Sequence, residues 1–123
     1  MILKNSLYTI VAKNDTEKGI VFRIRLNSEH TIYKAHFPGQ PITPGVCITQ
    51  IAKELIEEHR NESLEIKAIK NIKFLSIISP DDVTEIDYNI TSIKEEEDAV
   101  KSQISVTSGD VVYAKISLVC QKQ

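Results

Sequence analysis

One segment, residues 43–60, constrains the fold of this chain more than any other, because it alone has the pattern of a long helix. Apolar residues recur there at spacings of three and four: Val46, Ile48, Ile51, Ala52, Leu55 and Ile56. This spacing predicts a helix whose first turns are apolar almost all round. Thr43 is the expected N-cap, and Pro44 suits the first helical position because it has no N–H to leave unpaired. Residues 57–60 are polar, so we expect the helix to start buried and to end at the surface.

Most of the remaining chain has the pattern of strands separated by turns. Residues 6–12 and 20–26 predict an opening hairpin, and apolar and polar residues alternate in its second strand. Four more strands are expected after the helix: 64–78, 83–93, 100–107 and 111–120. Polar segments rich in turn-forming residues separate them at 79–82, 94–98 and 108–110.

This order of elements predicts an α+β protein. A single helix with so wide an apolar surface, followed by a meander of four antiparallel strands, is best buried when the sheet curls around it. That arrangement is the hotdog fold, which we expect as a single domain over residues 1–123. An open sheet with the helix on one face is the competing α+β arrangement, and the pattern alone does not choose between them.

Composition excludes several classes of function. The chain has 123 residues, 41% of them hydrophobic, which suffices to bury a core without disulfides. Net charge is −2 with acids and bases interspersed, so nucleic-acid binding is not expected. The start of the chain turns polar at once and no apolar run is long enough to span a membrane, so we expect a cytoplasmic protein. Cys47 and Cys120 are expected to be reduced and buried.

The segment before the helix is a shaped loop. Residues 36–45 hold three of the four prolines and two of the four glycines, which excludes a regular element. Of the three histidines, only His36 lies in this loop, whereas His30 and His59 are expected to be ordinary surface residues. No two histidines have the spacing of metal ligands on one helix face, so neither a metal nor another cofactor is expected.

Residues 36–46, His-Phe-Pro-Gly-Gln-Pro-Ile-Thr-Pro-Gly-Val, resemble the active-site signature of the 3-hydroxyacyl-acyl-carrier-protein dehydratases. That signature reads His-Phe-Pro-Gly-x-Pro-x-x-Pro-Gly-Val before a central helix, and eight positions agree in type and spacing. Residues 72–82 and 111–115 resemble the family more weakly, with Asp81 in place of a usual glycine. The resemblance implies elimination of water from a 3-hydroxyacyl thioester to give a trans-2-enoyl thioester. It also implies a substrate on acyl carrier protein or another phosphopantetheine thioester, and a homodimer with two composite sites.

The resemblance also assigns roles within the loop. His36 is implied as the base that takes the proton from C2 of the substrate. Free N–H groups of Gly45 and Val46 at the helix start are expected to hold the thioester oxygen. Gly39 is expected in a turn that other residues resist, and Phe37 either lines the acyl path or serves in packing.

One position departs from the family. Its catalytic carboxylate comes fourteen residues after the histidine, on the helix of the neighbouring subunit, and here that residue is Gln50. An amide does not deliver a proton as a carboxylic acid does. Glu54 stands one helical turn further on, where the family tends to have glutamine. Three interpretations stay open: Glu54 substitutes as the acid, Gln50 orients a hydroxyl or a water, or dehydration is lost.

Two other functions compete with dehydration. One is a hotdog thioesterase, in which Gln50 positions water against a carbonyl held at Gly45 and Val46. The other is a partner subunit that forms a heterodimer with an active homologue and supplies half of each site. A nucleophilic role for Cys47 is less favoured, because the family normally has a plain apolar residue there.

Overall fold

The structure, a computed structural model, describes all residues from 1 to 123. Its elements in chain order are β1 (Tyr8–Thr16), β2 (Gly19–Leu26), α1 (Ile32–Ala35), α2 (Gly45–Arg60), β3 (Leu64–Phe74), β4 (Glu85–Glu96), β5 (Ala99–Ser108) and β6 (Val111–Lys122). The predicted hairpin, loop, long helix and four later strands are confirmed as elements. Two bounds are wrong, because β1 runs to Thr16 and not to residue 12, and β3 ends at Phe74 and not at residue 78. The short helix α1 immediately before the loop was not predicted.

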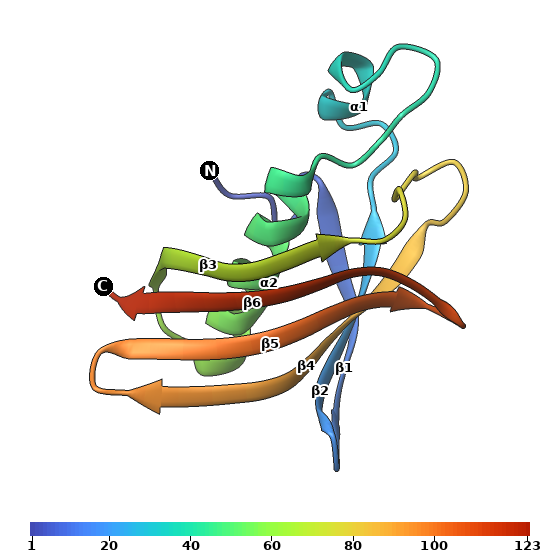
Figure 1. The fold of residues 1–123 in the computed structure, drawn as a ribbon. Coiled ribbons are helices and arrows are strands. Elements are labelled where there is room, and N and C mark those ends of the chain that lie inside the picture. Colours follow the sequence, from blue (N-terminus) through green and yellow to red (C-terminus); the bar gives the residue numbers. More distant parts are fainter.

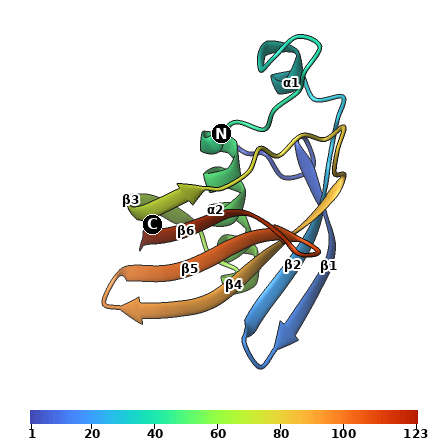
Figure 2. The ribbon, with the colours of Figure 1, turned by 45° about the vertical axis from the view of Figure 1, so that its right-hand side comes forward.

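The six strands form one antiparallel sheet in the order β1-β2-β4-β5-β6-β3. The sheet curves around α2, which crosses its concave side (Figures 1 and 2). Strand β3 follows α2 in sequence but lies at the far edge of the sheet, beside β6. The expected simple meander is therefore wrong at β3, because the helix carries the chain across the sheet before that strand begins. The curled sheet around one central helix confirms the predicted hotdog fold.

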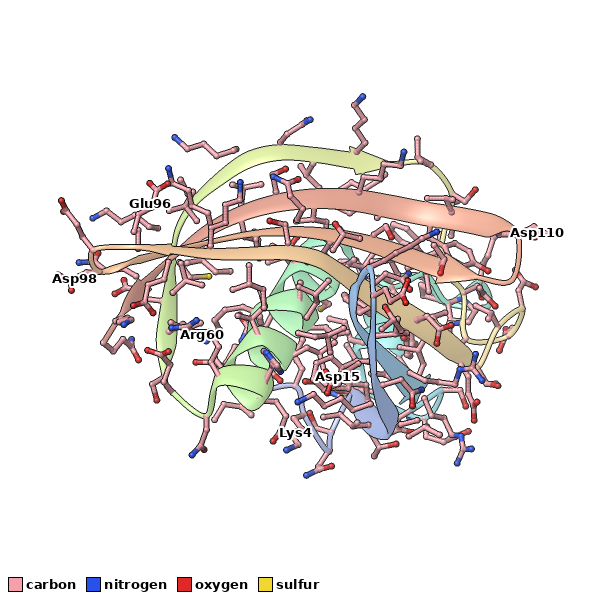
Figure 3. The ribbon with its side chains drawn as sticks, turned by 90° about the horizontal axis from the view of Figure 1, so that it is seen from below. Lys4, Asp15, Arg60, Glu96, Asp98 and Asp110 are labelled. Carbon is pink, nitrogen blue, oxygen red and sulfur yellow. The ribbon has the colours of Figure 1, made fainter.

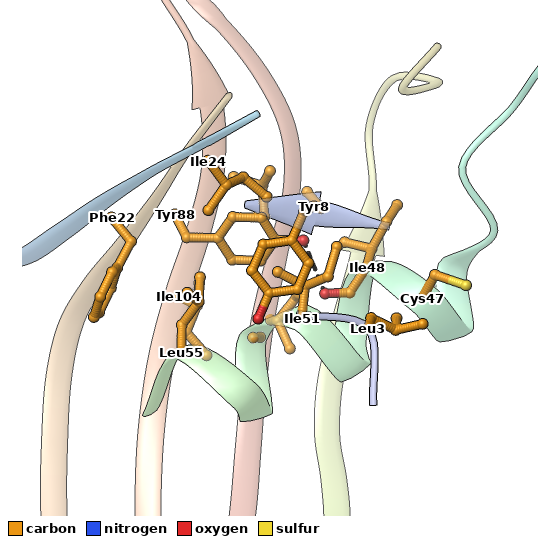
Figure 4. Close-up of a cluster of buried hydrophobic side chains, with 14 of the residues drawn as sticks. Leu3, Tyr8, Phe22, Ile24, Cys47, Ile48, Ile51, Leu55, Tyr88 and Ile104 are labelled. Carbon is orange, nitrogen blue, oxygen red and sulfur yellow. Dashed lines mark hydrogen bonds between the residues drawn. The ribbon is translucent and has the colours of Figure 1, made fainter. Parts of the chain in front are cut away.

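The core lies between α2 and the concave face of the sheet. Alternation along β2 turns Phe22, Ile24 and Leu26 inward, where each is at most 4% exposed. Figure 4 shows side chains of α2 among those of the strands and the two tyrosines Tyr8 and Tyr88. The Tyr88 hydroxyl donates a hydrogen bond of 2.9 Å to the Ile48 carbonyl oxygen, so the tyrosine packs its ring in the core without an unpaired O–H.

Charged side chains lie around the periphery, at hairpins and strand ends (Figure 3). Strand β4 continues to Glu96, so the predicted turn at 94–98 is wrong in its first half. At this end of the strand Glu96 pairs with Lys101 at 2.9 Å and Glu95 pairs with Lys122 at 2.9 Å, so these carboxylates lie on paired strands and not in a turn. The turn itself is confined to Glu97 and Asp98, and Glu97 has a φ of 56°.

The start of α2 differs from the expected N-cap. The helix begins at Gly45 with Pro44 at the N-cap position, and no side chain caps it. Thr43 is buried, and its hydroxyl shares a hydrogen bond of 2.9 Å with the Tyr33 hydroxyl. The predicted cap at Thr43 is therefore wrong, because the buried tyrosine engages the threonine side chain instead. None of the helices is both long and apolar enough to span a bilayer.

Candidate active site

The loop of residues 36–44 is fixed by its backbone. The His36 N–H donates to the Ile32 carbonyl oxygen at 3.0 Å, which attaches the start of the loop to α1. The Ile42 N–H donates to the His36 carbonyl oxygen at 2.7 Å, and the Thr43 N–H donates to the Ile78 carbonyl oxygen at 2.8 Å. Both ends of the loop are therefore tied down by main-chain bonds, which leave the His36 side chain free.

A tight turn projects from this loop at residues 37–40. The Phe37 N–H donates to the Gln40 carbonyl oxygen at 3.0 Å, and the Gln40 N–H donates to the Phe37 carbonyl oxygen at 2.9 Å. Pro38 and Gly39 occupy the two central positions, and Gly39 has a φ of 77°. A side chain at such a φ is strained, so the turn requires the glycine, as the sequence predicted.

The His36 imidazole is exposed and no hydrogen bond from the chain holds it. Its ring lies edge-on to the Phe37 ring, with centroids 5.6 Å apart, and Phe37 is itself 54% exposed. The other two histidines differ from it. His30 accepts a hydrogen bond of 3.0 Å at Nδ1 from the Ile32 N–H, and burial lowers the pKa of His59, whose Nδ1 is buried without a partner. Only His36 offers a ring free to contact a ligand at both nitrogens.

The start of α2 presents two backbone donors. The first hydrogen bonds of the helix run from the Cys47 and Ile48 N–H groups to the Pro44 carbonyl oxygen, at 3.0 and 3.1 Å. The N–H groups of Gly45 and Val46 have no acceptor within the chain. The positive end of the helix dipole lies here, so the pair favours an oxygen that develops negative charge.

An apolar hollow opens beside these donors, with a volume of about 320 Å³. Its lining residues are Ile42, Thr43, Gly45, Ile48, Phe74, Leu75, Ser76, Ile77 and Ile78. The Phe74 ring lies over Gly45 so closely that a Cβ there would come within 2.7 Å of the ring. An apolar hollow beside two N–H donors suits a chain with one polar end, such as an acyl thioester.

Phe74, Leu75 and Ile77 were not singled out from the sequence, because residues 64–78 have the pattern of one continuous strand. The strand ends at Phe74, and the residues after it leave the sheet to line the hollow. The nearby Pro80 and Asp81 were the available signal for such a turn away from the sheet, and they come only a few residues later.

Glu54 lies in the middle of α2 and is 7% exposed. Its Oε2 accepts hydrogen bonds of 2.8 Å from the Leu3 N–H and from Gln50 Nε2. Its Oε1 accepts one of 2.8 Å from the Lys4 N–H and one of 3.0 Å from the Tyr8 hydroxyl. Burial and the negative charge of Glu54 together raise the pKa of Tyr8, which keeps the hydroxyl a donor. We call Glu54 and these four donors the Glu54 cluster.

Gln50 belongs to the same cluster. Besides Glu54, its Nε2 donates a hydrogen bond of 2.9 Å to the Met1 carbonyl oxygen. Gln50 and Glu54 thus hold residues 1–4 against the helix. Both line a groove of about 580 Å³, which is separate from the apolar hollow and has no lining residue in common with it. Within one chain the structure joins Gln50 to Glu54, but no hydrogen bond joins either of them to His36.

The partners of Glu54 gave no signal in the sequence. Two of them are backbone N–H groups, which every residue but proline has. They also lie 50 and 51 residues away along the chain.

The two cysteines are buried as predicted. Burial raises the pKa of the Cys47 thiol and raises that of Cys120 to about 11. A raised thiol pKa lowers the fraction of reactive thiolate, which argues against Cys47 as a nucleophile. No three His, Cys, Asp or Glu side chains gather in an arrangement that would hold a metal ion.

The sequence is similar to those of curated dehydratases. The 3-hydroxyacyl-acyl-carrier-protein dehydratase FabZ of Wolbachia pipientis wMel is 29% identical over 123 residues, covering 92% of this chain and 84% of the relative. The FabZ of Clostridium acetobutylicum is 27% identical over 93 residues, covering 70% of this chain and 66% of the relative.

Solved structures with the same fold include the dehydratase heterocomplex ApeI:P from Xenorhabdus doucetiae, with a TM-score of 0.67 and 14% identity, covering 92% of this chain and 96% of that one. A putative thioesterase from Lactococcus lactis has a TM-score of 0.68 and 15% identity, covering 99% and 97%. The ApeI-like family, described as ApeI dehydratase, matches residues 12–114. This match includes the whole His36 loop and most of the sheet, and the chain belongs to the ApeI-like dehydratase family.

Proposed function

We propose that this chain is a subunit of a dehydratase that eliminates water from 3-hydroxyacyl thioesters, with His36 as the base. The observation that carries the proposal is the exposed, unbonded His36 imidazole in a loop that leads directly to two free N–H donors, Gly45 and Val46. Removal of a proton next to a carbonyl requires both a base and donors for the developing oxyanion, and this loop and the helix start that follows it provide both.

The proposed reaction uses these groups in order. The His36 imidazole takes the proton from C2 of the substrate while the N–H groups of Gly45 and Val46 hold the thioester oxygen as it becomes enolate-like. The hydroxyl then leaves from C3 with a proton from an acid, which yields water and the trans-2-enoyl thioester. The apolar hollow along Phe74 takes the acyl chain, and acyl carrier protein presents the substrate on its phosphopantetheine arm.

Glu54 is a poor source for that proton. Its two oxygens already accept four hydrogen bonds, and donating a proton would require the carboxyl group to lose at least one of these contacts. We infer that Glu54 holds the fold and that Gln50 orients the leaving hydroxyl or a water. The proton for the leaving hydroxyl then comes either from a water that Gln50 orients or from an acid on another chain.

This inference favours a second candidate function, that of a partner subunit in a heterodimer with an acid-bearing homologue. The supporting observation is the Glu54 cluster, which leaves this chain without a free carboxylate near position 50. The similar fold of a dehydratase heterocomplex is compatible with it. In such a heterodimer this chain supplies His36 and the N–H donors of one site, and the homologue supplies the carboxylic acid.

A mass-spectrometric assay of the purified protein with a 3-hydroxyacyl-carrier-protein substrate tests the proposal. We expect water loss that falls by about 10²–10⁴-fold in His36→Ala, the usual effect of removing one acid–base group. His59→Gln, which changes a histidine at the far end of α2, is the matched control and should retain the activity of the wild type. Water loss that persists in His36→Ala would exclude His36 as the base.

The variant Gln50→Glu separates the two candidate functions. It places a second carboxyl group against Glu54, and two carboxylates in contact raise the pKa of one of them, which makes a proton available near neutral pH. A wild type that is inert alone but gains dehydration with Gln50→Glu, or on mixing with an acid-bearing FabZ-type chain, supports the partner role. Dehydration by the pure wild type rejects that role, and release of a free acyl acid would point to thioesterase activity.

A further inference from the structure

The Gln50 side chain uses only one end of its amide within the chain. Its Nε2 donates hydrogen bonds of 2.9 Å to the Met1 carbonyl oxygen and of 2.8 Å to Glu54 Oε2. An amide nitrogen has two hydrogens, so these two bonds use both of them. Gln50 Oε1 accepts no hydrogen bond from the chain, and it is not buried. The amide therefore offers a ligand an acceptor and no donor.

The groups around Gln50 fix which end of its amide points outward. The Leu3 N–H donates to Glu54 Oε2 and the Lys4 N–H donates to Oε1, both at 2.8 Å, and a backbone N–H can only donate. Each carboxylate oxygen is therefore an acceptor, as is the Met1 carbonyl oxygen. If the Gln50 amide were turned over, its oxygen would lie against two other oxygens with no hydrogen between them. Glu54 thus passes the polarity of two backbone N–H groups on to Gln50.

Gln50 lies where a ligand can reach it. Its side chain is partly exposed and lines the groove of about 580 Å³ beside α2. Three carboxylates that line the same groove are engaged in salt bridges: Glu57 with Lys53, Glu58 with Lys4 and Glu62 with Arg60. Gln50 Oε1 differs from them, because it is neutral and has no partner in the chain.

We propose that Gln50 binds the hydroxyl of the substrate through its amide oxygen alone, with Glu54 as the positioning residue, and that this polarity selects a 3-hydroxyacyl over a 3-oxoacyl thioester. The inference rests on the proposed function, in which Gln50 faces the leaving hydroxyl. A hydroxyl can donate to Gln50 Oε1, whereas a 3-oxo group has no hydrogen to donate and would place one carbonyl oxygen against another. A site built to bind a hydroxyl rejects an analogue that leaves its polar group unpaired.

The same polarity suits departure of the hydroxyl. A hydroxyl group has one hydrogen and two lone pairs. When its hydrogen is donated to Gln50, both lone pairs stay free to take the proton that converts the hydroxyl into water. An amide turned the other way would donate to one of those lone pairs and compete with that proton. Gln50 therefore holds the leaving group without having to supply a proton itself.

Ligand binding without turnover tests the proposal. In the His36→Ala background, which lacks the proposed base, isothermal titration calorimetry compares the pantetheine thioesters of 3-hydroxybutanoate, 3-oxobutanoate and butanoate. We expect the 3-hydroxy thioester to bind at least about tenfold more tightly than the 3-oxo thioester, because the latter leaves the Gln50 oxygen unpaired. The butanoate thioester, which has neither group, should fall between the two. Equal affinities for the 3-hydroxy and 3-oxo thioesters would overturn the proposal.

Two substitutions in that background separate the acceptor from its support. Gln50→Met keeps a side chain of similar length without the amide, so the preference for the 3-hydroxy thioester should disappear. Glu54→Gln replaces the carboxylate with an amide that can present either end, so the Gln50 amide can turn over and the preference should fall. A purely structural role of Glu54 would lower both affinities by the same factor and leave their ratio unchanged, which would overturn the positioning role.

Glu58→Gln is the matched control for Glu54→Gln. It makes the same change in charge one turn further along α2, at a residue that lines the same groove but pairs with Lys4 and not with Gln50. It should retain the full preference, so a loss equal to that of Glu54→Gln would contradict the proposal.

A second measurement applies if Glu54→Gln does not fold by circular dichroism. In the nuclear magnetic resonance spectrum of the wild type, the side-chain N–H protons of Gln50 should exchange with solvent more slowly than those of the exposed Gln40. Equal exchange rates would show that the Gln50 amide is not held and would overturn the proposal.

The binding test and the dehydration assay can fail separately. A preference for the 3-hydroxy thioester together with no dehydration by the wild type rejects only the proposed chemistry. Dehydration by the wild type without that preference rejects only the inference about Gln50. A folded protein that binds none of the three thioesters overturns the inference as well.

Discussion

The His36 loop and the Glu54 cluster adjoin the same helix, but they are built in opposite ways. In the loop, main-chain hydrogen bonds fix the backbone and the His36 side chain has no hydrogen bond from the chain. In the cluster, a buried carboxylate accepts four hydrogen bonds and so secures another segment of the chain. The contrast teaches that a polar side chain is available for chemistry when the fold does not use it for support. Four substitutions test this comparison.

The largest expected effect on stability is that of Glu54→Ala. It leaves the N–H groups of Leu3 and Lys4 and the Tyr8 hydroxyl without their acceptor, which should reduce the free energy of unfolding by about 3–5 kcal/mol. Urea denaturation measures the change. Glu58→Ala removes only an exposed salt bridge with Lys4 and should cost at most about 1 kcal/mol. Equal effects of the two variants would show that the cluster does not support the fold.

Tyr33→Phe is expected to have an intermediate effect. It removes the hydroxyl that shares a hydrogen bond with the buried Thr43 side chain at the end of the loop. The loss of this bond should cost about 1–2 kcal/mol in thermal or urea unfolding. The double variant Tyr33→Phe, Thr43→Val removes both partners and should recover part of that loss. No recovery would mean that the two hydroxyls are not coupled.

Gly45→Ala should cost about 1 kcal/mol or somewhat more, because its Cβ would come within 2.7 Å of the Phe74 ring. Since Phe74 is half-exposed, its ring can move away, and this keeps the cost at the low end. Phe74→Leu in the same chain should relieve the crowding, as measured by a double-mutant cycle of unfolding free energies. An additive cycle would show that the two positions do not meet.

The smallest expected change in stability is that of His36→Ala, within about 0.5 kcal/mol, because the exposed ring has no hydrogen bond from the chain. Circular dichroism melting measures it. The same variant is expected to suffer the large loss of activity described above, so stability and function should separate at this residue. A loss of stability comparable to that of Glu54→Ala would remove the distinction between the two regions.

Local patterns in the sequence predicted the elements whose causes are local. The apolar spacing from Val46 to Ile56 located α2, and the prolines of residues 36–45 located the loop. The role of Thr43 was not predictable in the same way, because the hydroxyl that engages it belongs to Tyr33, ten residues earlier. The position of β3 also escaped prediction, because strand composition does not reveal which strand becomes a neighbour across the sheet.

The resemblance in the loop located the exposed histidine and the start of the helix. It did not predict that the Glu54 carboxylate is buried and fully hydrogen-bonded. Sequence spacing placed Gln50 and Glu54 on one helical face, and the structure brings them within 2.8 Å of each other. The other three hydrogen-bond donors to the Glu54 carboxylate come from residues 3–8. The sequence of that segment has no pattern that predicts contact with the helix. The candidate acid could thus be named from sequence, but its surroundings could not.

The placement of β3 beside β6 bears on how the molecule reaches its native state. Residues 64–74 leave the ribosome well before residues 111–122, so β3 has no neighbour to pair with until the last strand has been made. Closing a contact between segments so far apart along the chain is slow, because the intervening chain loses much of its freedom before the contact forms. We therefore expect the β1–β2 hairpin, α2 and the β4–β6 strands to assemble first. The edge strand β3 is then the last strand to become ordered, and a chain shortened before residue 111 lacks the only strand that pairs with it.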